Sequence, residues 1–282
     1  MVYSWSLILS TYSRELVSRK RTTHKRKLTL EEVGDCKPGK TRRKKGSCLP
    51  ASVPRDPSCG PHDDHCVLDH ASLPSNQQEA LRKDYLRPRY PTSWVKDEDE
   101  WLDNQQIASV MKQYEEAYPW FRFMGALPID FSAPDPYAQD KTQTRCLHPD
   151  MCSLDLHKVY KEGVRGIGIV FNLDPHFKGG SHWVGLYIDI HDIERPAVSF
   201  SDSYGFKPPR LIARFMRALR LQTPQATLGY NARRFQFSDT ECGMYSMYFI
   251  ICMIQGIPFK AFCKDSVPDR FMLALRAVLF SK

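Results

Sequence analysis

Long hydrophobic runs are missing from this 282-residue sequence. No stretch approaches the roughly 20 apolar residues that a helix needs to cross a bilayer, so we expect no membrane-spanning segment. The short apolar stretch in residues 1–12 (MVYSWSLILSTY) has neither a basic start nor a clear small-residue cleavage site. It is therefore a weak signal-peptide candidate, and secretion is not predicted.

Regular cysteine spacing is also missing. The nine cysteines form no repeated pattern, and without a secretion signal they favour a reducing intracellular compartment. We therefore expect the thiols to stay free and predict no disulfide framework.

Excess positive charge is confined to one end of the chain. The first fifty residues carry 13 Lys/Arg and four Asp/Glu, whereas the remaining residues carry 27 Lys/Arg and 28 Asp/Glu. The basic residues gather in SRKRTTHKRK (18–27) and KPGKTRRKKG (37–46). This composition predicts a mostly disordered basic extension over residues 1–80, followed by a catalytic domain over 81–282. The clusters could bind nucleic acid through its phosphates, direct nuclear import, or simply be a solvated tail.

A group of metal-ligand residue types lies in this extension: Cys59, His62, His65, Cys66 and His70. Its two Cys-His pairs are so close in sequence that the intervening loop barely closes around an ion. We therefore favour a polar linker and predict no metal; the sequence also predicts no cofactor.

Three separated segments point to nucleophilic catalysis by a thiol. His182 opens an alternating run typical of a strand, Asp202 closes the next run (197–201), and Cys242 precedes the apolar segment Gly243–Ile254. A cysteine attacks carbonyls as its thiolate, so it needs a histidine to take its proton and a third group to hold the imidazole. We expect the carboxylate on the imidazole Nδ1 and the thiol near Nε2, with Asp189 and Asp192 as alternative carboxylates.

The residues around Cys242 suit the same chemistry. A position in the first turn of a buried helix stabilises a thiolate through the helix dipole. Gln236 could join the Cys242 backbone N–H in stabilising an oxyanion, and Gly243 would let substrate approach without an intervening side chain. The sequence therefore predicts a thiol protease with catalytic His182, Asp202, Cys242 and Gln236.

These segments, together with Trp101–Glu115, Gly166–Trp183 and Asp202–Pro209, resemble one superfamily across residues 85–282. It comprises the cysteine proteases that process SUMO and other ubiquitin-like modifiers, and the maturation proteases of adenoviruses and large DNA viruses of the African swine fever virus type. The viral branch is the most similar. The resemblance implies that Trp101 and Trp183 wall a narrow tunnel that passes only glycine, with cleavage after Gly-Gly or Gly-X-Gly. One departure is Trp-Leu-Asp-Asn at residue 101, where SUMO proteases have Trp-Leu-Asn-Asp.

The resulting functional hypothesis is an endopeptidase that processes viral structural polyprotein precursors through an acyl-enzyme. The alternatives are an isopeptidase for SUMO or a related modifier, and an inactive protease-fold protein that binds DNA or acts as a scaffold. The expected partner is a protein with a glycine-rich cleavage site, with nucleic acid as a further partner of the basic segment. A virion or infected cell is the expected location, with the nucleus suggested by the basic clusters. The oligomeric state and any activator stay open.

The pattern of elements predicts an α+β, papain-like/adenovirus-protease-like fold with a central sheet flanked by helices. We expect helices over 103–118, 209–221, 243–254 and 268–281, strands over 121–123, 166–172, 183–190, 197–201 and 227–237, and loops over 131–150 and 172–180.

Overall fold

The computed structural model describes residues 28–42, 47–60, 62–136 and 146–281. Its elements, in chain order, are α2 (Leu30–Val33), α3 (Asp64–His70), α4 (Ser75–Tyr85), η1 (Thr92–Val95), α5 (Asn104–Ala117), β1 (Phe121–Pro128), α6 (Pro149–Cys152), α7 (Leu156–Lys161), β2 (Gly166–Asn172), β3 (Trp183–Asp189), β4 (Ala197–Ser201), α8 (Arg210–Gln222), β5 (Thr227–Tyr230), α9 (Cys242–Ile254), α10 (Phe259–Lys264) and α11 (Asp269–Leu279).

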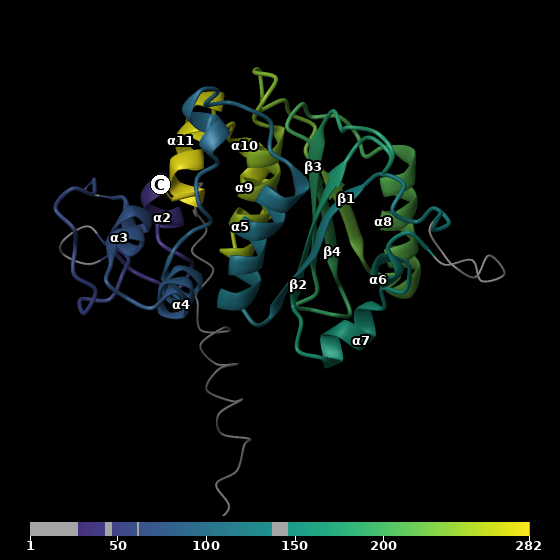
Figure 1. The fold of residues 1–282 in the computed structure, drawn as a ribbon. Helices are drawn as coiled ribbons and strands as arrows, with labels where there is room; N and C mark the ends of the chain where they lie inside the picture. Colours follow the sequence, from purple (N-terminus) through teal and green to yellow (C-terminus); the bar gives the residue numbers. More distant parts are fainter. Residues whose placement is uncertain (1–27, 43–46, 61, 137–145, 282) are drawn as a thin grey trace, which may run out of the picture.

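One five-stranded sheet organises the fold, and its strands lie in chain order from β1 to β5. The two outer pairs, β1 with β2 and β4 with β5, are parallel, while β2–β3 and β3–β4 are antiparallel. Helices α5, α9, α10 and α11 cover one face, and α6, α7 and α8 cover the other (Figure 1). The predicted α+β architecture is therefore confirmed.

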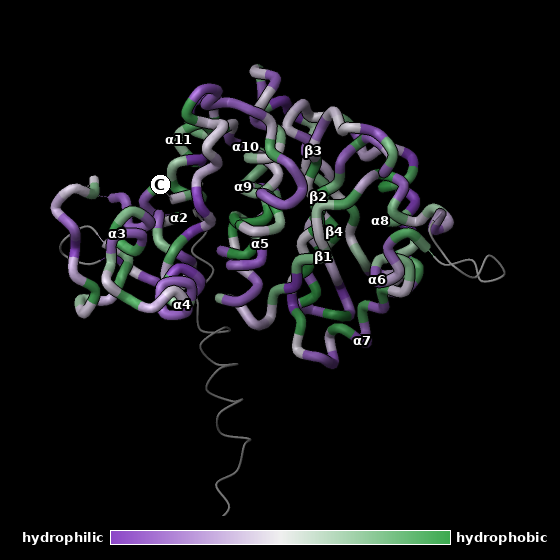
Figure 2. Tube along the Cα trace, viewed as in Figure 1, coloured by the Kyte–Doolittle hydropathy of each residue, from purple (hydrophilic) through white to green (hydrophobic). Residues whose placement is uncertain are grey.

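Each face of the sheet has its own apolar core, and α9 lies at the centre of one of them. Every residue of α9 is buried, and Figure 2 shows it in hydrophobic colours between the sheet and the outer helices. The helix approaches β3 closely at Gly185, where a Cβ would lie 2.9 Å from Cδ1 of Phe249. This contact fixes the helix, and with it Cys242, against the strand that follows His182.

The sequence patterns gave most of these elements correctly. In α5, Asp103 and Gln106 form a capping box, and the predicted stripe of Ile107, Val110, Met111 and Tyr114 is buried. In α8, Ile212, Met216 and Leu219 are buried as predicted, but Leu211 is 37% exposed.

Two strand predictions were wrong in length. β1 continues to Pro128 and crosses a register shift between Phe123 and Ala126, whereas a strand of only 121–123 was predicted. β5 ends at Tyr230 instead of near 237, because the Asn231 side chain bonds the backbone N–H and C=O of Asp202 in place of a continuing ladder.

The described part of residues 28–80 is folded, where the composition predicted mostly disorder. Helices α2 and α3 lie here and α4 begins here, and a small core forms from Cys36, Cys48, Leu49, Cys59, Val67 and Leu68 together with Leu86, which follows α4. Composition missed this segment because its few apolar residues, spread over α3 and the loops around it, meet only after folding.

Six cysteines are paired, which corrects the expectation of free thiols. The pairs are Cys36–Cys48, Cys59–Cys66 and Cys146–Cys152. Their spacing follows no framework pattern, so only the folded chain shows which sulfurs meet.

Basic residues 37–42 contact the chain itself. Lys37 pairs with Glu116 at 2.6 Å, Lys40 lies over the Tyr85 ring, and Arg42 pairs with Asp35. The cluster 18–27 and residues 43–46 lie outside the described residues. Among the residues that the structure describes, no helix has the length and apolar character that crossing a membrane requires.

Candidate active site

His182 and Asp202 meet at one edge of the sheet. His182 directly precedes β3, Asp202 directly follows β4, and these strands pair antiparallel with Gly185 opposite Ser201. The imidazole Nε2 lies 2.9 Å from Oδ1 of Asp202. The structure thus brings the two together as predicted, but the nitrogen was assigned wrongly: the carboxylate takes Nε2, not Nδ1. Strand ends place the two residues but do not fix the ring rotamer.

Asp202 is fixed from several sides. It is 1% exposed, and its Oδ1 also accepts the Tyr204 N–H at 2.8 Å. The alternative carboxylates lie elsewhere: Asp189, at the far end of β3, bonds His191, and Asp192 bonds Arg195.

Cys242 begins α9 and carries a free, buried thiol. The pKa of His182 is raised to about 9: burial lowers it, but hydrogen bonds with Asp202 and Cys242 and the negative charges of both outweigh burial. His182 is therefore favoured as an imidazolium at neutral pH, and Cys242 is one of the two groups that favour this charged form. Such a pair stabilises the nucleophilic thiolate.

Gln236 is fully buried, and its hydrogen-bond partner Ser203 directly follows Asp202 in the chain. Its Oε1 accepts the Ser203 hydroxyl at 2.6 Å and its Nε2 donates to the Ser238 carbonyl at 2.8 Å. An amide nitrogen has two hydrogens, so one remains for a developing oxyanion. These bonds fix the orientation of the amide.

Sequence reasoning missed three side chains at the site. The Tyr204 ring stacks on His182, with centroids 4.9 Å apart. Asp269, the first residue of α11, accepts the backbone N–H groups of Phe237 and Ser238 at 2.9 Å and bonds the Tyr245 hydroxyl. Asp269 thereby fixes the turn that leads from Gln236 to Cys242. Tyr204 could have been found in the DSYG segment, but nothing local marks Asp269 or Tyr245.

A buried ion pair holds the start of α9. The Nε–H of Arg276 is shared between the two carboxylate oxygens of Glu241, at 3.0 Å from each, and both residues are at most 2% exposed. Arg276 also donates to the Glu100 carbonyl at 2.8 Å and lies over the Trp94 ring. It thus ties the residue before Cys242 to the one before Trp101.

The predicted substrate residues differ in their surroundings. Trp183 is 8% exposed, and its indole N–H donates to the Leu102 carbonyl at 2.8 Å. Trp101 is 46% exposed. A Cβ on Gly243 would lie 3.0 Å from Cδ1 of Leu102 and 3.4 Å from Cδ1 of Trp183. Gly243 therefore makes room for Leu102 and Trp183, and its predicted role in substrate access stays a prediction.

Several known proteins are similar to this chain. One, from Acanthamoeba polyphaga mimivirus and named for a thiol protease activity, is 28% identical over 230 residues, covering 79% of this chain and 70% of its own. A cysteine protease of African swine fever virus is 23% identical over 265 residues, covering 84% and 92%. The crystal structure of a protease from that virus superposes with a TM-score of 0.66 at 20% identity, covering 89% of this chain and 96% of its own. The fold is therefore that of the viral cysteine protease.

The expected resemblance to viral thiol proteases and SUMO-type proteases is confirmed, and the chain is a cysteine-type peptidase. The family model that it matches is named for acyl transfer to hydroxyl groups rather than for proteolysis. Both activities suit a cysteine that forms an acyl-enzyme. Since residues 89–267 match that model, the chain belongs to the family described as "YopJ Serine/Threonine acetyltransferase".

Proposed function

We propose that Cys242 is the nucleophile of an endopeptidase, with His182 as its acid-base partner, Asp202 as the group that orients the imidazole, and Gln236 in the oxyanion hole. One observation carries this proposal: the imidazole Nε2 of the buried His182 lies 2.9 Å from Oδ1 of Asp202, and Asp202 and Cys242 together raise the pKa of His182 to about 9. The three residues come from the edge of the sheet and the start of α9.

The proposed roles of these residues define an order of proton transfers. The Cys242 thiolate attacks the scissile carbonyl, and the oxyanion receives hydrogen bonds from the Cys242 N–H and the Gln236 amide. His182 gives its Nδ1 proton to the departing amine, which leaves an acyl thioester. The neutral imidazole then takes a proton from water, whose oxygen attacks the thioester and releases the acid.

The proposed specificity is cleavage after Gly-Gly or Gly-X-Gly, with Trp101 and Trp183 beside the substrate backbone. Indoles on both sides of an extended chain leave no room for a Cβ. The exposure of Trp101 supports this specificity. A large apolar side chain that stays exposed to solvent favours a binding role, and the next residue, Leu102, contacts Trp183. We further propose that the natural substrate is a viral structural precursor, processed in the virion or infected cell.

A panel of fluorogenic peptides tests the proposal. The purified chain is expected to cleave Gly-Gly-X peptides and to reject Gly-Ala-X and Ala-Gly-X peptides, while Cys242→Ala removes all turnover. Equal cleavage of the alanine peptides would contradict the specificity, and turnover by Cys242→Ala would contradict the nucleophile assignment.

Two activities other than endopeptidase cleavage have specific support from the similar proteins. Some relatives are named SUMO-1 cysteine proteases, which favours an isopeptidase activity. The family description favours transfer to a Ser or Thr hydroxyl. Incubating the chain with SUMO conjugates, and separately with an acyl thioester and a Ser/Thr peptide, distinguishes these. If SUMO conjugates were cleaved far faster than any Gly-Gly-X peptide, an isopeptidase activity would take the place of the maturation proposal. If acyl transfer to the Ser/Thr peptide were faster than hydrolysis, an acyltransferase activity would take its place.

We also propose that the basic segment binds nucleic acid, which would concentrate the protease near a packaged genome. The contacts of Lys37, Lys40 and Arg42 leave this role mainly to residues 18–27 and 43–46. A variant lacking residues 1–27 is expected to lose most of its salt-dependent DNA affinity. Equal affinity at the same ionic strength would rule out the role of residues 18–27.

A further inference from the structure

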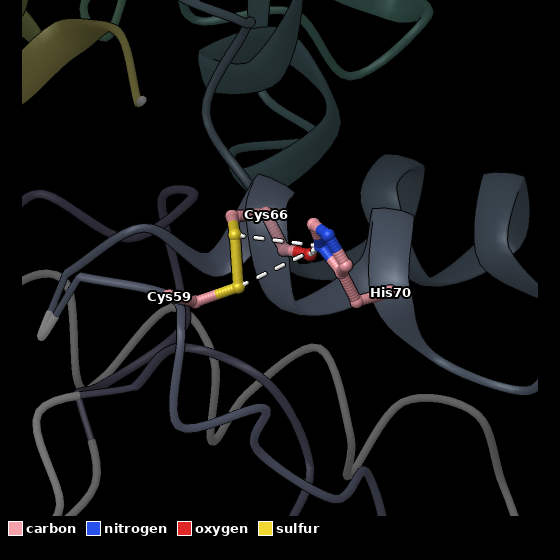
Figure 3. A group of neighbouring side chains, drawn as sticks. All are labelled: Cys59, Cys66 and His70. Carbon is pink, nitrogen blue, oxygen red and sulfur yellow. Dashed lines mark hydrogen bonds between the residues drawn. A yellow bond between two sulfur atoms is a disulfide. The ribbon is translucent and has the colours of Figure 1, made fainter.

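A group of metal-ligand side chains lies in the N-terminal segment, between α3 and the loop before it. Cys59, Cys66 and His70 place two sulfurs and a ring nitrogen within 4.8 Å of one another. Figure 3 shows the imidazole of His70 directed at both sulfurs of the Cys59–Cys66 disulfide. These are ligand types that zinc prefers.

Local structure brings the three residues together. The Asp63 side chain caps α3 by accepting the Cys66 N–H at 2.8 Å, which sets Cys66 in the first turn. His70 is four residues further along the same helix, so it shares a face with Cys66. A turn in which the Cys59 N–H bonds the Asp56 carbonyl at 3.1 Å brings Cys59 to that face. The objection from the sequence concerned the short loop between the Cys59–His62 and Cys66–His70 pairs, but the group that the structure brings together does not include His62.

The nitrogen is already at a ligand's distance from each sulfur. Nδ1 of His70 lies 3.6 Å from Sγ of Cys66 and 3.8 Å from Sγ of Cys59. The same nitrogen lies 3.0 Å from the backbone carbonyl oxygen of Cys66, a contact that a metal ion would replace. Tetrahedral zinc, with Zn–S of about 2.3 Å and Zn–N of about 2.0 Å, separates such ligands by about 3.5 Å. Only the two sulfurs are too close, because they are bonded to each other. His65 is not part of this group: its Nε2 bonds the Ser281 hydroxyl at 3.0 Å.

We propose that Cys59, Cys66 and His70 bind Zn²⁺ once their disulfide is reduced. The reduction needs two equivalents of a cellular thiol such as glutathione: two electrons and two protons go to the cysteine sulfurs, and the reductant leaves as its own disulfide. Zinc then replaces the two thiol protons and the lone pair of Nδ1 binds it, with water in the fourth position. The exposed His70 and the partly exposed Cys66 leave that position open to solvent.

The Cys59–Cys66 disulfide and the Cys242 thiol experience the same redox conditions. A thiol peptidase works where Cys242 stays reduced, and the same conditions expose the Cys59–Cys66 bond to cellular thiols. Zinc would keep α3 attached to the loop at residue 59 there, so the small N-terminal core would retain a cross-link in either state. Among the described residues, the group around Cys36 and Cys48 includes no imidazole, and its third member, Asp35, is already paired with Arg42.

Cobalt titration tests the proposal. The full chain with Cys242→Ala, which removes the thiol beside His182, is reduced and titrated with Co²⁺. One equivalent is expected to give thiolate-to-cobalt charge-transfer absorption and tetrahedral d–d bands, which Zn²⁺ abolishes.

His70→Gln and Cys66→Ser are each expected to weaken cobalt binding at least tenfold. Zn²⁺ is expected to raise the Tm of the reduced Cys242→Ala parent but not the Tm of these variants. Because His70 is exposed, its replacement should leave the fold intact.

A matched control replaces the other N-terminal pair, Cys36→Ser with Cys48→Ser, and is expected to keep the cobalt spectrum. The proposal is overturned if the reduced chain gives no charge-transfer band, if His70→Gln binds cobalt as tightly as the parent, or if the control loses the spectrum to the same extent. Mass spectrometry that finds Cys59–Cys66 still oxidised under these conditions would also overturn it.

Discussion

At the scale of single residues, His182 determines the pH dependence that we expect. Its pKa of about 9 means that the imidazolium is present at neutral pH and is lost as the pH rises through that value. Loss of the imidazolium removes both the partner of the thiolate and the acid for the leaving amine. Since the folded-state pKa is raised, the stability that this group contributes is also present at low pH and lost in the same alkaline range.

Asp202→Asn should shift the alkaline limit of activity. Removing the carboxylate charge lowers the pKa of His182, so the fall in kcat/KM moves to lower pH, and the maximum drops by about two powers of ten. A pH profile of peptide hydrolysis measures this. Asp189→Asn is the control, because Asp189 bonds His191 and not His182. A limit at the same pH in Asp202→Asn would show that the carboxylate does not tune the imidazole.

Gln236→Ala should lower kcat by about two to three powers of ten through the lost oxyanion donor, with a smaller effect on KM. Ser203→Ala is the control: it removes the hydroxyl that bonds Oε1 but leaves the Nε2 donor, so its loss should be much smaller. Steady-state kinetics of both variants gives the comparison. Equal losses in the two would assign Gln236 a role in folding only.

At the scale of elements, the start of α9 depends on a buried charge pair. Burial raises the pKa of Glu241, and the hydrogen bond and charge of Arg276 oppose that rise. Arg276→Met leaves the carboxylate buried without its partner, and breaking such a pair costs about 3–5 kcal/mol of unfolding free energy. The loss should grow as pH rises, because a group with a raised folded-state pKa destabilises the fold once it ionises.

Urea unfolding at acidic and alkaline pH measures this effect. The double variant Glu241→Leu with Arg276→Met is the control, since apolar replacement of both partners should restore most of the stability. A single variant as stable as the parent at every pH would mean that Glu241 finds another partner or water.

Elements whose signal is local were predictable, and contacts between distant segments were not. β2 and β4 have the predicted bounds because continuous apolar runs flanked by polar residues mark buried strands. His182, Asp202 and Cys242 could be chosen because strand ends and helix starts gather at one edge. The choice of Nε2 for Asp202, and the support from Asp269, depend on rotamers and on a helix that follows Cys242 by nearly 30 residues. The spacing of residues along the sequence does not predict those contacts.

At the scale of the whole molecule, the N-terminal segment packs on the catalytic core. Leu28, Leu30 and Val33 lie against the core that contains α9, and the Tyr248 hydroxyl donates to the Leu28 carbonyl at 3.0 Å. The guanidinium of Arg87, which is 1% exposed, donates to the Gly34 carbonyl at 3.0 Å. A domain boundary at residue 80 therefore cuts through contacts that the composition alone does not reveal.

A variant lacking residues 1–80 should consequently be less stable than the full chain. Three partly buried apolar side chains at about 1 kcal/mol each give a loss of about 3 kcal/mol, and Arg87 loses acceptors for a buried charge as well. Chemical denaturation of the reduced proteins measures this, with activity on a Gly-Gly peptide as a second readout. The matched control lacks only residues 1–27 and keeps every contact described above. If both variants unfold at the same denaturant concentration as the full chain, residues 28–80 contribute nothing to the core, and the segment is an appendage after all.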